Sequence, residues 1–394
     1  MADITGYTAP GYEGVRAAFA DNFDHRGDLG ASFALYRDGA LVVELHGGVT
    51  QPGGTTPYGP DHLQLVFSAT KGATAICAHI LAERGLLDLE APVSDYWPEF
   101  AAHGKQDVPV SWLLSHRVGL PDVDRPMTFE QALAWDPVVE ALADSVPVWE
   151  PGADRGYHAV TYGWLVGEVV RRVSGRSLGR FFAEEVAAPL GLEFWIGLPD
   201  EHHDRVVPLV PISLPEGMHL GDPAAPQPGM IAMLQMLMGA DSLIARALSA
   251  PGGSLVNDDD WNRSELWSAE IPAVNGIGTA TALAKMYAAT VSDVDGVRLL
   301  NDDTIRNAIE VRSSGPDQVL VFDIPFGLGF MRDSMFARFG SPTAFGHYGA
   351  GGSVGFADHH HRIGFGYAMN KMELGIAGDP RTAALIDAVY ASLS

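Results

Sequence analysis

The chain has 394 residues, of which 47% are hydrophobic and 19% charged, a composition typical of a compact globular protein and not of a disordered chain. Its 25 basic and 49 acidic side chains give a net charge of −24 at pH 7, which disfavours nucleic acids and anionic membranes as partners. The one cysteine, Cys77, excludes an internal disulfide, and the sequence shows neither a recognisable signal segment nor an apolar run long enough to cross a membrane, so we expect a soluble, cytoplasmic protein.

The first predicted elements are a β-hairpin and a helix. Residues 32–36 and 41–45 are rich in β-forming residues and flank an Asp-Gly pair, which supplies the positive φ of a tight turn. Further along, a stretch of small and apolar residues from Ser68 predicts a helix that Gly85 ends. Ser68 therefore lies in the first turn of an apolar helix.

The middle of the chain is predicted to be mainly helical, and its end to return to β structure. Apolar residues recur every three to four positions, with proline and glycine loops between them, over residues 129–143, 161–174, 178–187, 230–248 and 279–289. Short strands are predicted over residues 326–331, 352–357 and 363–369, and a closing helix over residues 380–393. A sheet that begins near the N-terminus would thus be completed by the C-terminal residues.

This order of elements predicts an α/β fold in which one lobe is interrupted by another. Residues 1–80 and 295–394 are predicted to form an α/β lobe around a central sheet, and residues 81–294 a mainly helical lobe. Substrates commonly bind in clefts between two such lobes, so we expect the active site there.

One lysine is placed where it could activate a serine. Only four lysines occur in the chain, and Lys71 lies three residues after Ser68. On a helix this spacing puts the two side chains on one face within hydrogen-bond reach, and the helix N-terminus favours negative charge that develops near Ser68. A serine hydroxyl is a weak nucleophile near neutral pH and needs such a neighbour. The alternative interpretation makes Ser68 an N-cap and Lys71 a solvated residue, since Ser-x-x-Lys by itself is a common pattern.

A second informative segment runs from residue 149 to 167, where a Pro-Gly loop brings Tyr157 and Tyr162 to the start of a helix. Together with other segments it resembles, in order and spacing, the serine β-lactamase-like superfamily, which includes class C β-lactamases, D-Ala-D-Ala peptidases and family VIII carboxylesterases. The resemblance covers about residues 14 to 390 and rests on Ser68-Ala69-Thr70-Lys71, Leu113-Leu114-Ser115-His116-Arg117-Val118-Gly119-Leu120-Pro121, Tyr157 with Tyr162 and Gly167, and Pro189-Leu190-Gly191-Leu192. It implies a β-lactamase-like α/β fold, an antiparallel sheet flanked by helices with a mainly helical second lobe, most like that of family VIII carboxylesterases.

The resemblance also implies roles for particular residues. Ser68 would be the nucleophile and Tyr157 the general base, with the positive charge of Lys71 keeping the tyrosine or the serine partly deprotonated. A phenol with a pKa near 10 needs such a cation to act as a base at neutral pH. The backbone N–H groups of Ser68 and Ala350 would form the oxyanion hole, where loss of one donor commonly costs about 3 to 4 kcal/mol. No metal or organic cofactor is implied.

A third segment, residues 345–358, lies where the superfamily has a Lys-Thr-Gly strand beside the site. His347, Tyr348 and Gly349 occupy those positions, and the resemblance makes them substrate-binding residues; His347 could contact the leaving group or be a satisfied strand-end histidine. Ala159 stands where the lactamases and peptidases have the asparagine of Tyr-x-Asn, which binds the substrate amide. An ester has a better leaving group than an amide and needs neither polar contact, so both departures favour ester hydrolysis.

Other motifs compete with this interpretation. Gly-x-Ser-x-Gly, the nucleophile elbow of α/β-hydrolases, occurs around Ser177 and Ser353, but neither serine has the strand before it and the helix after it that an elbow requires. Adjacent histidines at 202–203 and 359–361 would point to opposite faces of a strand and cannot all ligate one ion, which favours an exposed turn over a metal site. The methionine-rich segment 230–238 is interpreted as core packing or, alternatively, as the lining of an acyl pocket.

We therefore expect a serine carboxylesterase that hydrolyses short-chain acyl or aryl esters through an acyl-enzyme on Ser68, with Lys71 and Tyr157 as the base pair. Its expected partner is a small-molecule ester, without nucleic acid, membrane, metal or cofactor. Two alternatives stay open. One is hydrolysis of β-lactams, D-amino-acid peptides or other amides on the same fold, and the other is a binding or assembly protein that keeps the fold without turnover.

Overall fold

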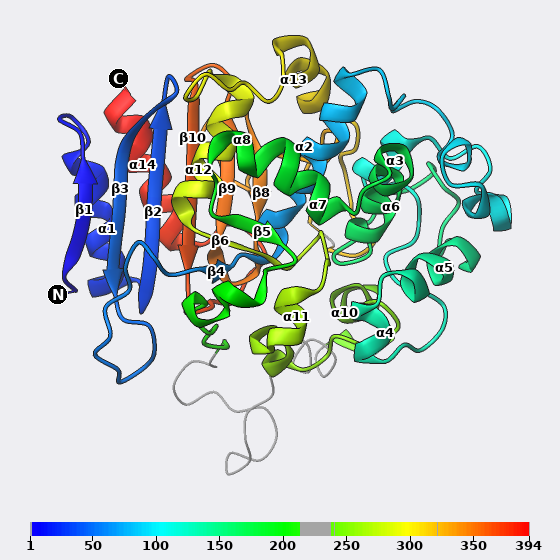
Figure 1. Cartoon of the computed structure of the whole chain (residues 1–394), viewed down its shortest axis with the longest axis horizontal. Coiled ribbons are helices and arrows are strands. Elements are labelled where there is room, and N and C mark those ends of the chain that lie inside the picture. The colour runs from blue at the N-terminus through cyan, green and yellow to red at the C-terminus, as the bar shows by residue number, and fades with distance from the viewer. Residues whose placement is uncertain (1, 213–237, 240, 321, 394) are drawn as a thin grey trace.

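The computed structural model describes residues 2–212, 238–239, 241–320 and 322–393 (Figure 1). Its larger sheet has the strand order β1-β3-β2-β10-β9-β8-β7, and all neighbours are antiparallel. The strands are β1 (Ile4–Thr8), β2 (Gly30–Arg37), β3 (Ala40–Gly48), β7 (Met331–Arg332), β8 (Ala344–Tyr348), β9 (Val354–Asp358) and β10 (Ile363–Met369). Because β2 pairs with β10, the prediction of one sheet shared by both ends of the chain is confirmed.

The predicted hairpin forms between β2 and β3. Asp38 and Gly39 connect the two strands with φ values of 50° and 82°, the left-handed region that a tight turn requires and that glycine and aspartate tolerate well. Pairs such as Phe33 with Leu45 then face each other in buried positions. The turn chemistry read from the sequence therefore places these strands correctly.

Helices cover both faces of the larger sheet. α1 (Glu13–His25) and α14 (Pro380–Leu393) pack together on one face, and α12 (Ala280–Val291) lies against β2, β9 and β10 on the other (Figure 1). Gly364 and Gly366 of β10 permit this close approach, because a Cβ at either position would lie 2.2 Å from a backbone oxygen of α12. α12 thus packs on the sheet although it lies inside the range 81–294; the division of the chain at residues 80 and 295 stays a prediction.

α2 (Thr70–Glu83) is the central helix of the region beside the sheet. Its residues from Thr70 to Leu81 are all buried, and it packs against α6 (Tyr162–Ser174) and α7 (Leu178–Phe182). The other α-helices are α3 (Val110–Leu114), α4 (Phe129–Leu133), α5 (Asp136–Asp144), α8 (Ala188–Leu190), α10 (Leu243–Ser249), α11 (Ser264–Ser268) and α13 (Asp302–Ile309). The short helical turns are η1 (Phe67–Ala69), η2 (Val93–Asp95), η3 (Pro98–Gly104), η4 (Ala183–Ala187), η5 (Asp200–Arg205), η6 (Asp258–Asn262) and η7 (Ala350–Gly352). A second sheet has the strand order β4 (Gln64–Leu65), β6 (Gly276–Gly278) and β5 (Phe194–Ile196).

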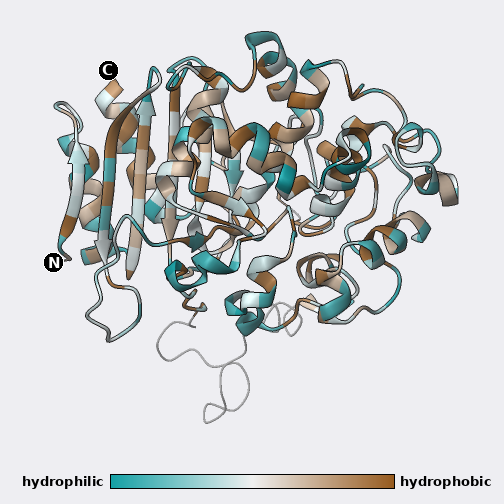
Figure 2. Cartoon of the chain, in the orientation of Figure 1, coloured by the Kyte–Doolittle hydropathy of each residue, from teal (hydrophilic) through white to brown (hydrophobic). Residues whose placement is uncertain are grey.

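Strongly hydrophobic residues are frequent along the strands of the larger sheet (Figure 2). Within the described ranges, none of the helices combines the length and the apolar composition that crossing a bilayer demands.

Some predicted elements differ from the observed ones. The helix predicted over 129–143 is broken into α4 and α5, because Trp135 takes a φ of 60° and its indole N–H donates to the buried carboxylate of Glu168 at 2.9 Å. The strand predicted over 326–331 is reduced to the two residues of β7. Of the helix predicted over 230–248, residues 230–237, with most of the methionine-rich segment, lie outside the described residues.

Candidate active site

Ser68 lies at the junction between η1 and α2, next to a strained residue. Phe67 has a φ of 44°, a left-handed conformation that bulky residues rarely adopt, and strain of this kind concentrates at functional sites. The Thr70 hydroxyl holds the turn, since it donates to Phe67 O at 2.5 Å and accepts from the N–H of Gly276 at 2.8 Å. Ser68 is thereby presented, partly exposed, at the end of an otherwise buried helix.

Lys71 is fully buried, and its amine has three oxygen neighbours. Nζ lies 2.9 Å from Ser68 Oγ, 2.5 Å from the carbonyl oxygen of Ala159 and 3.2 Å from that of Ala273. Burial lowers the pKa of Lys71 well below its usual range, because the buried ammonium ion loses its hydration. A neutral amine would donate to the two carbonyls and direct its lone pair towards the Ser68 hydroxyl. The structure therefore brings the predicted pair together, in surroundings that shift the amine towards its neutral form.

Tyr157 reaches the same serine from a distant loop. Its side chain is 2% exposed and hydrogen-bonds Ser68, and its ring centroid lies 4.8 Å from Lys71 Nζ. The backbone N–H of Tyr157 donates to Asp317 Oδ1 at 3.0 Å, which holds the loop in place. Burial raises the pKa of Tyr157, and the hydrogen bond with Ser68 offsets only part of that rise. Burial thus favours the neutral forms of both side chains in the free protein, and the role of a Lys71 cation in deprotonating Tyr157 or Ser68 stays a prediction.

The two predicted oxyanion donors belong to residues that line one pocket. Ser68 is the second residue of η1, and Ala350 is the first residue of the kinked turn η7, inside which Gly351 has a φ of 82°. The next N–H along, that of Gly351, donates to Gly375 O at 3.1 Å. Both residues therefore lie at one pocket, and the role of their N–H groups as oxyanion donors stays a prediction.

His347 lies on β8 with its ring against that of Tyr157. The ring centroids are 5.9 Å apart and the ring planes differ by 28°, and His347 is fully buried. Nδ1 lies 2.6 Å from Tyr348 O and donates to it, which leaves Nε2 as an acceptor without a hydrogen-bond partner among the described residues. Burial and the nearby Lys71 lower the pKa of His347 well below its usual range. The ring therefore offers a neutral acceptor.

Tyr348 and Gly349, the other two predicted substrate-binding residues, are directed elsewhere. Successive side chains on a strand alternate between its faces, so Tyr348 points away from His347, and its hydroxyl donates to Arg338 O at 2.5 Å. A Cβ at Gly349 would lie 2.1 Å from Val66 O, so this glycine permits close packing of two backbone segments. As far as the described residues show, both shape the end of β8 without lining the pocket at Ser68.

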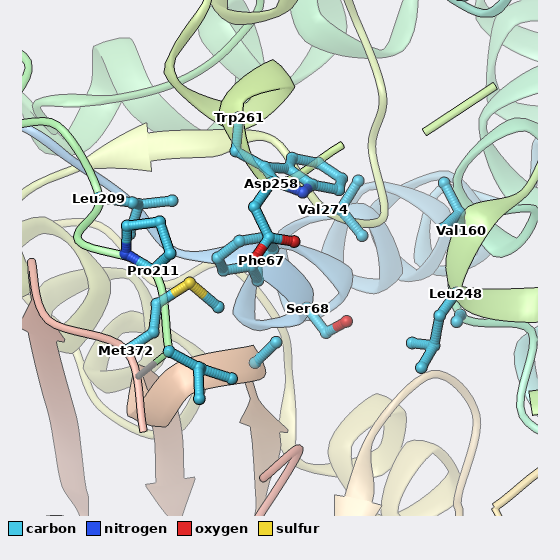
Figure 3. Close-up of a pocket in the computed structure, with 13 residues that line it drawn as sticks. Phe67, Ser68, Val160, Leu209, Pro211, Leu248, Asp258, Trp261, Val274 and Met372 are labelled. Carbon is cyan, nitrogen blue, oxygen red and sulfur yellow. The ribbon is translucent and has the colours of Figure 1, made fainter. Parts of the chain in front are cut away.

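The pocket in front of Ser68 is mostly apolar (Figure 3). Its cavity volume is small, about 40 Å³, and the pocket is partly open to solvent. Its lining consists of Phe67, Ser68, Ala159, Val160, Leu209, Pro211, Ile212, Leu248, Asp258, Trp261, Val274, Ala350 and Met372. The rings of Phe67 and Trp261 meet edge to face, with 5.0 Å between centroids. Such a lining suits a small apolar acyl or alcohol group.

Sequence reasoning missed several residues of this region. Asp258, Trp261 and Asp317 lie in short turns and loops without a spaced motif, so no signal in the sequence pointed to them. His116 belongs to the segment 113–121 that carries part of the family resemblance, but it was assigned no role. Its ring lies 5.0 Å from that of Tyr157, and its Nδ1 accepts the His158 N–H at 3.2 Å, which helps to position the tyrosine loop.

The competing motifs have structural roles. Ser177 caps α7 and donates to Glu270 at 2.6 Å, whereas Ser353 donates to Val66 O at 2.7 Å. Residues 359–361 form the turn after β9, as predicted. Among the residues whose placement is described, no group of three or more His, Cys, Asp or Glu side chains is arranged to hold a metal ion.

An antiparallel sheet covered by helices, with the Ser-x-x-Lys helix beside it, defines a hydrolase of the β-lactamase-like fold. The beta-lactamase family matches residues 18–389, and the chain belongs to this family. The resemblance and the fold expected from the sequence are thereby confirmed.

Individual relatives include esterases. Esterase/beta-lactamase LipL of Mycobacterium tuberculosis (strain ATCC 25618 / H37Rv) is 33% identical over 393 residues, which cover 94% of this chain and 83% of that protein. A family VIII carboxylesterase of known crystal structure is 36% identical in sequence to this chain, with a TM-score of 0.87. The match covers 99% of this chain and 100% of the carboxylesterase chain. A penicillin-binding protein homologue from Caulobacter crescentus is 37% identical with a TM-score of 0.86, again covering 99% of this chain and 100% of its own.

Proposed function

We propose that the protein is a serine carboxylesterase that hydrolyses short-chain acyl or aryl esters, with Ser68 as its nucleophile. The observation that carries the proposal is the 2.9 Å contact between Ser68 Oγ and the buried Lys71 amine, beside an apolar pocket. The esterase descriptions of two relatives support it. A small-molecule ester is the partner that this pocket suits.

Acylation begins with attack of Ser68 Oγ on the ester carbonyl carbon, while the hydroxyl proton passes to the neutral Lys71 amine. The new ammonium ion then lies close to Tyr157 and lowers the pKa of the phenol at that moment, so the tyrosine can relay a proton to the departing alcohol oxygen. The C–O bond of the ester breaks and leaves the acyl group on Ser68. The backbone N–H groups of Ser68 and Ala350 stabilise the oxyanion formed on the way.

Deacylation reverses these roles. Water adds to the acyl carbon and gives a proton to the Lys71 and Tyr157 pair, and the carboxylic acid leaves as Ser68 recovers its hydroxyl proton. His347 Nε2, an acceptor beside Tyr157, suits a contact with the hydroxyl of the leaving alcohol or of the incoming water.

The residues around the serine favour esters over amides. At position 159, where an amide-binding asparagine would stand, the chain has an alanine whose carbonyl is engaged by Lys71. At position 347 a neutral histidine replaces the lysine that would attract a substrate carboxylate. Because these two polar contacts are missing, the site favours hydrolysis of a substrate with a good leaving group, such as an ester.

β-Lactam hydrolysis is a second candidate, because the description of LipL pairs esterase with beta-lactamase. A head-to-head assay with 4-nitrophenyl butyrate and a chromogenic cephalosporin separates the two. We expect a kcat/KM at least about 100-fold higher on the ester, which corresponds to about 3 kcal/mol of transition-state stabilisation. An equal or higher kcat/KM on the cephalosporin would show that β-lactam hydrolysis is the main activity of the protein.

Covalent labelling tests whether Ser68 is a nucleophile or whether the protein keeps the fold without turnover. Treatment with a serine-reactive phosphonate should add one label to the intact mass, and peptide mapping should place it on Ser68. A protein without label, or with the label on Ser177 or Ser353, contradicts the proposal. The matched control is the Ser68→Ala protein, which should take up none.

We also propose a cytosolic location. The single cysteine, Cys77, is a free thiol buried in α2, which suits a reducing compartment. Fractionation of the native host, with the protein followed by antibody, tests this.

A further inference from the structure

One buried arginine holds two separate segments of the pocket wall. Arg381 is the second residue of α14, and its side chain is 1% exposed. Its Nη2 donates to the carbonyl oxygen of Gly351 at 2.6 Å, and its Nη1 donates to that of Lys371 at 2.9 Å. Gly351 is the neighbour of Ala350, which lines the pocket. Lys371 is the neighbour of Met372, which lines it too. One guanidinium group therefore joins two parts of the pocket wall.

Two carboxylates hold this guanidinium group from its other sides. Nη1 also donates to Asp28 Oδ1 at 3.1 Å, whereas Nε and Nη2 donate to the Asp379 carboxylate at 3.0 and 2.6 Å. Burial raises the pKa of Asp28 to about 6, so at neutral pH its side chain is mostly ionised and pairs with Arg381. Together with the two carbonyl oxygens, these acceptors engage all five N–H groups of the planar guanidinium, which fixes their relative positions.

The turn η7 depends on contacts of this kind, because its backbone is irregular. Gly351, in its middle, has a left-handed conformation. Its N–H donates to Gly375 O at 3.1 Å, and its carbonyl oxygen also accepts from the N–H of Glu373 at 3.1 Å. A Cβ at Gly352 would lie 2.4 Å from Arg381 Nη2, so this glycine lets the guanidinium group approach the turn. Contacts with the segment that leads into α14 therefore help to set the position of η7.

A simpler role for Arg381 would be to stabilise the start of α14. Asp379 caps this helix, since its side chain accepts from the N–H of Arg381 at 2.7 Å and its carbonyl oxygen from the N–H of Ala383 at 2.9 Å. Neither bond involves the guanidinium group or the carbonyl oxygen of Gly351. The contacts with the pocket wall thus indicate a role beyond the helix end.

We propose that Arg381 is a positioning residue for ester hydrolysis, whose guanidinium group holds η7 so that the N–H of Ala350 faces the oxyanion formed at Ser68. This inference rests on the proposed esterase mechanism and adds to it a residue that does not touch the substrate. Misplacement of a catalytic group by about 1 Å can lower a rate by about 100-fold. Because the oxyanion forms only during the reaction, the loss falls on kcat more than on KM.

The kinetics of Arg381→Lys on 4-nitrophenyl butyrate test the proposal. Lysine keeps a positive charge between the two carboxylates but has no planar fork with which to reach both backbone carbonyls. We expect kcat to fall by at least about tenfold while KM changes by less than about threefold. A wild-type kcat, or a change confined to KM, overturns the proposal.

Asp28→Asn is a milder variant that keeps the test available if Arg381→Lys does not fold. Asparagine has the shape of aspartate and keeps an acceptor for the Tyr367 hydroxyl, which donates to Asp28 Oδ1 at 2.7 Å. It removes the charge that holds one side of the guanidinium group. We expect kcat to fall by about threefold with an unchanged KM. An unchanged kcat in this variant contradicts the proposal.

A second buried ion pair provides the matched control. Arg171 donates through Nε and Nη2 to the buried carboxylate of Glu168 at 2.7 and 2.8 Å, and neither residue is among the described ones that line the pocket. Arg171→Lys removes a similar fork and should lower the melting temperature, with kcat within about twofold of wild type. All rates are measured well below the melting temperature of each variant. An equal fall in kcat in Arg171→Lys and Arg381→Lys would show a general effect of lost stability and overturns the proposal.

Hydrogen exchange of backbone amides measures how firmly η7 is held, without any turnover. Mass spectrometry of peptides that cover residues 349–353 should show exchange at least about tenfold faster in Arg381→Lys than in wild type, and no change in Arg171→Lys. Unchanged exchange in Arg381→Lys overturns the positioning role even if kcat has fallen. Faster exchange in a protein whose ester hydrolysis survives Ser68→Ala contradicts the esterase mechanism instead, and leaves the contact between Arg381 and η7 in place.

Discussion

The hydroxyl of Ser353 donates a hydrogen bond to the carbonyl oxygen of Val66 at 2.7 Å. This bond joins the segment that follows Ala350 to the residue two positions before Ser68. The two backbone N–H groups proposed to bind the oxyanion are therefore held relative to each other by one buried contact between distant parts of the chain.

Replacement of Ser353 by alanine tests this link. We expect kcat on 4-nitrophenyl butyrate to fall by about tenfold, because the oxyanion donors lose their mutual alignment. The free energy of unfolding should fall by only about 1 kcal/mol, since Val66 O loses the Ser353 hydroxyl but keeps the Ala69 N–H at 3.2 Å. Stopped-flow or steady-state kinetics and urea denaturation measure the two effects. A loss of stability with full kcat would show that the bond serves only the fold.

Ser68→Ala should reduce the esterase rate by about 10³-fold or more, the usual consequence of removing a serine nucleophile. The matched control is Ser177→Ala, which removes the serine of the other Gly-x-Ser-x-Gly sequence. That change deletes an N-cap and should cost about 1 kcal/mol of stability while kcat/KM stays within about twofold. Retention of the wild-type rate by Ser68→Ala ends the proposed mechanism.

Lys71 makes a prediction about pH. Burial lowers the pKa of Lys71 in the folded protein below the 10.5 of an ordinary lysine, so at a pH between the two pKa values the unfolded chain binds more protons. Wild-type stability should therefore gain from rising pH in this window, a gain that Lys71→Met lacks. The stability of the variant relative to wild type should decrease as the pH rises towards 10.5. Urea denaturation of both proteins between neutral and alkaline pH measures this, and a variant that gains stability relative to wild type as the pH rises would contradict the lowered pKa.

In the proposed mechanism, the protonation state of Lys71 also governs the rate of ester hydrolysis. Only the neutral amine can accept the Ser68 proton, so kcat/KM should fall as the pH drops through the lowered pKa of Lys71. A pH–rate profile on a neutral ester records it. A rate that instead rises on acidification would assign proton transfer to another group.

Gly349→Ala should strongly impair activity although it adds one methyl group. The new Cβ would lie 2.1 Å from Val66 O and 2.2 Å from Ser353 Oγ, so the backbone before Ala350 has to move. We expect a fall in kcat of about 100-fold and a destabilisation of about 1 to 3 kcal/mol, as overpacking causes. Gly14→Ala is the control, because a Cβ there meets nothing within 4 Å and Gly14 lies inside helix α1. The control should be active and at least as stable as wild type.

Local chemistry explains the successful predictions. The Asp-Gly turn of the first hairpin and the three-residue spacing of Ser68 and Lys71 depend on neighbours along the chain, and the structure shows both. Tyr157 came from the family resemblance, because no local pattern indicates which distant tyrosine reaches a serine. Side chains alternate along a strand, so His347 and Tyr348, as neighbours on β8, cannot both face the serine.

By itself, therefore, the sequence determined the elements with strong local signals, the family, and the nucleophile helix with its lysine. Only the tertiary structure decided that Lys71 is fully buried, that Tyr157 is close to it, and that Asp258 and Trp261 enter the pocket. The physical reason is that burial and protonation depend on contacts between segments far apart in the chain. Desolvation of Lys71 and Tyr157, which lowers the pKa of one and raises that of the other, is an example of an effect that no local pattern in the sequence indicates.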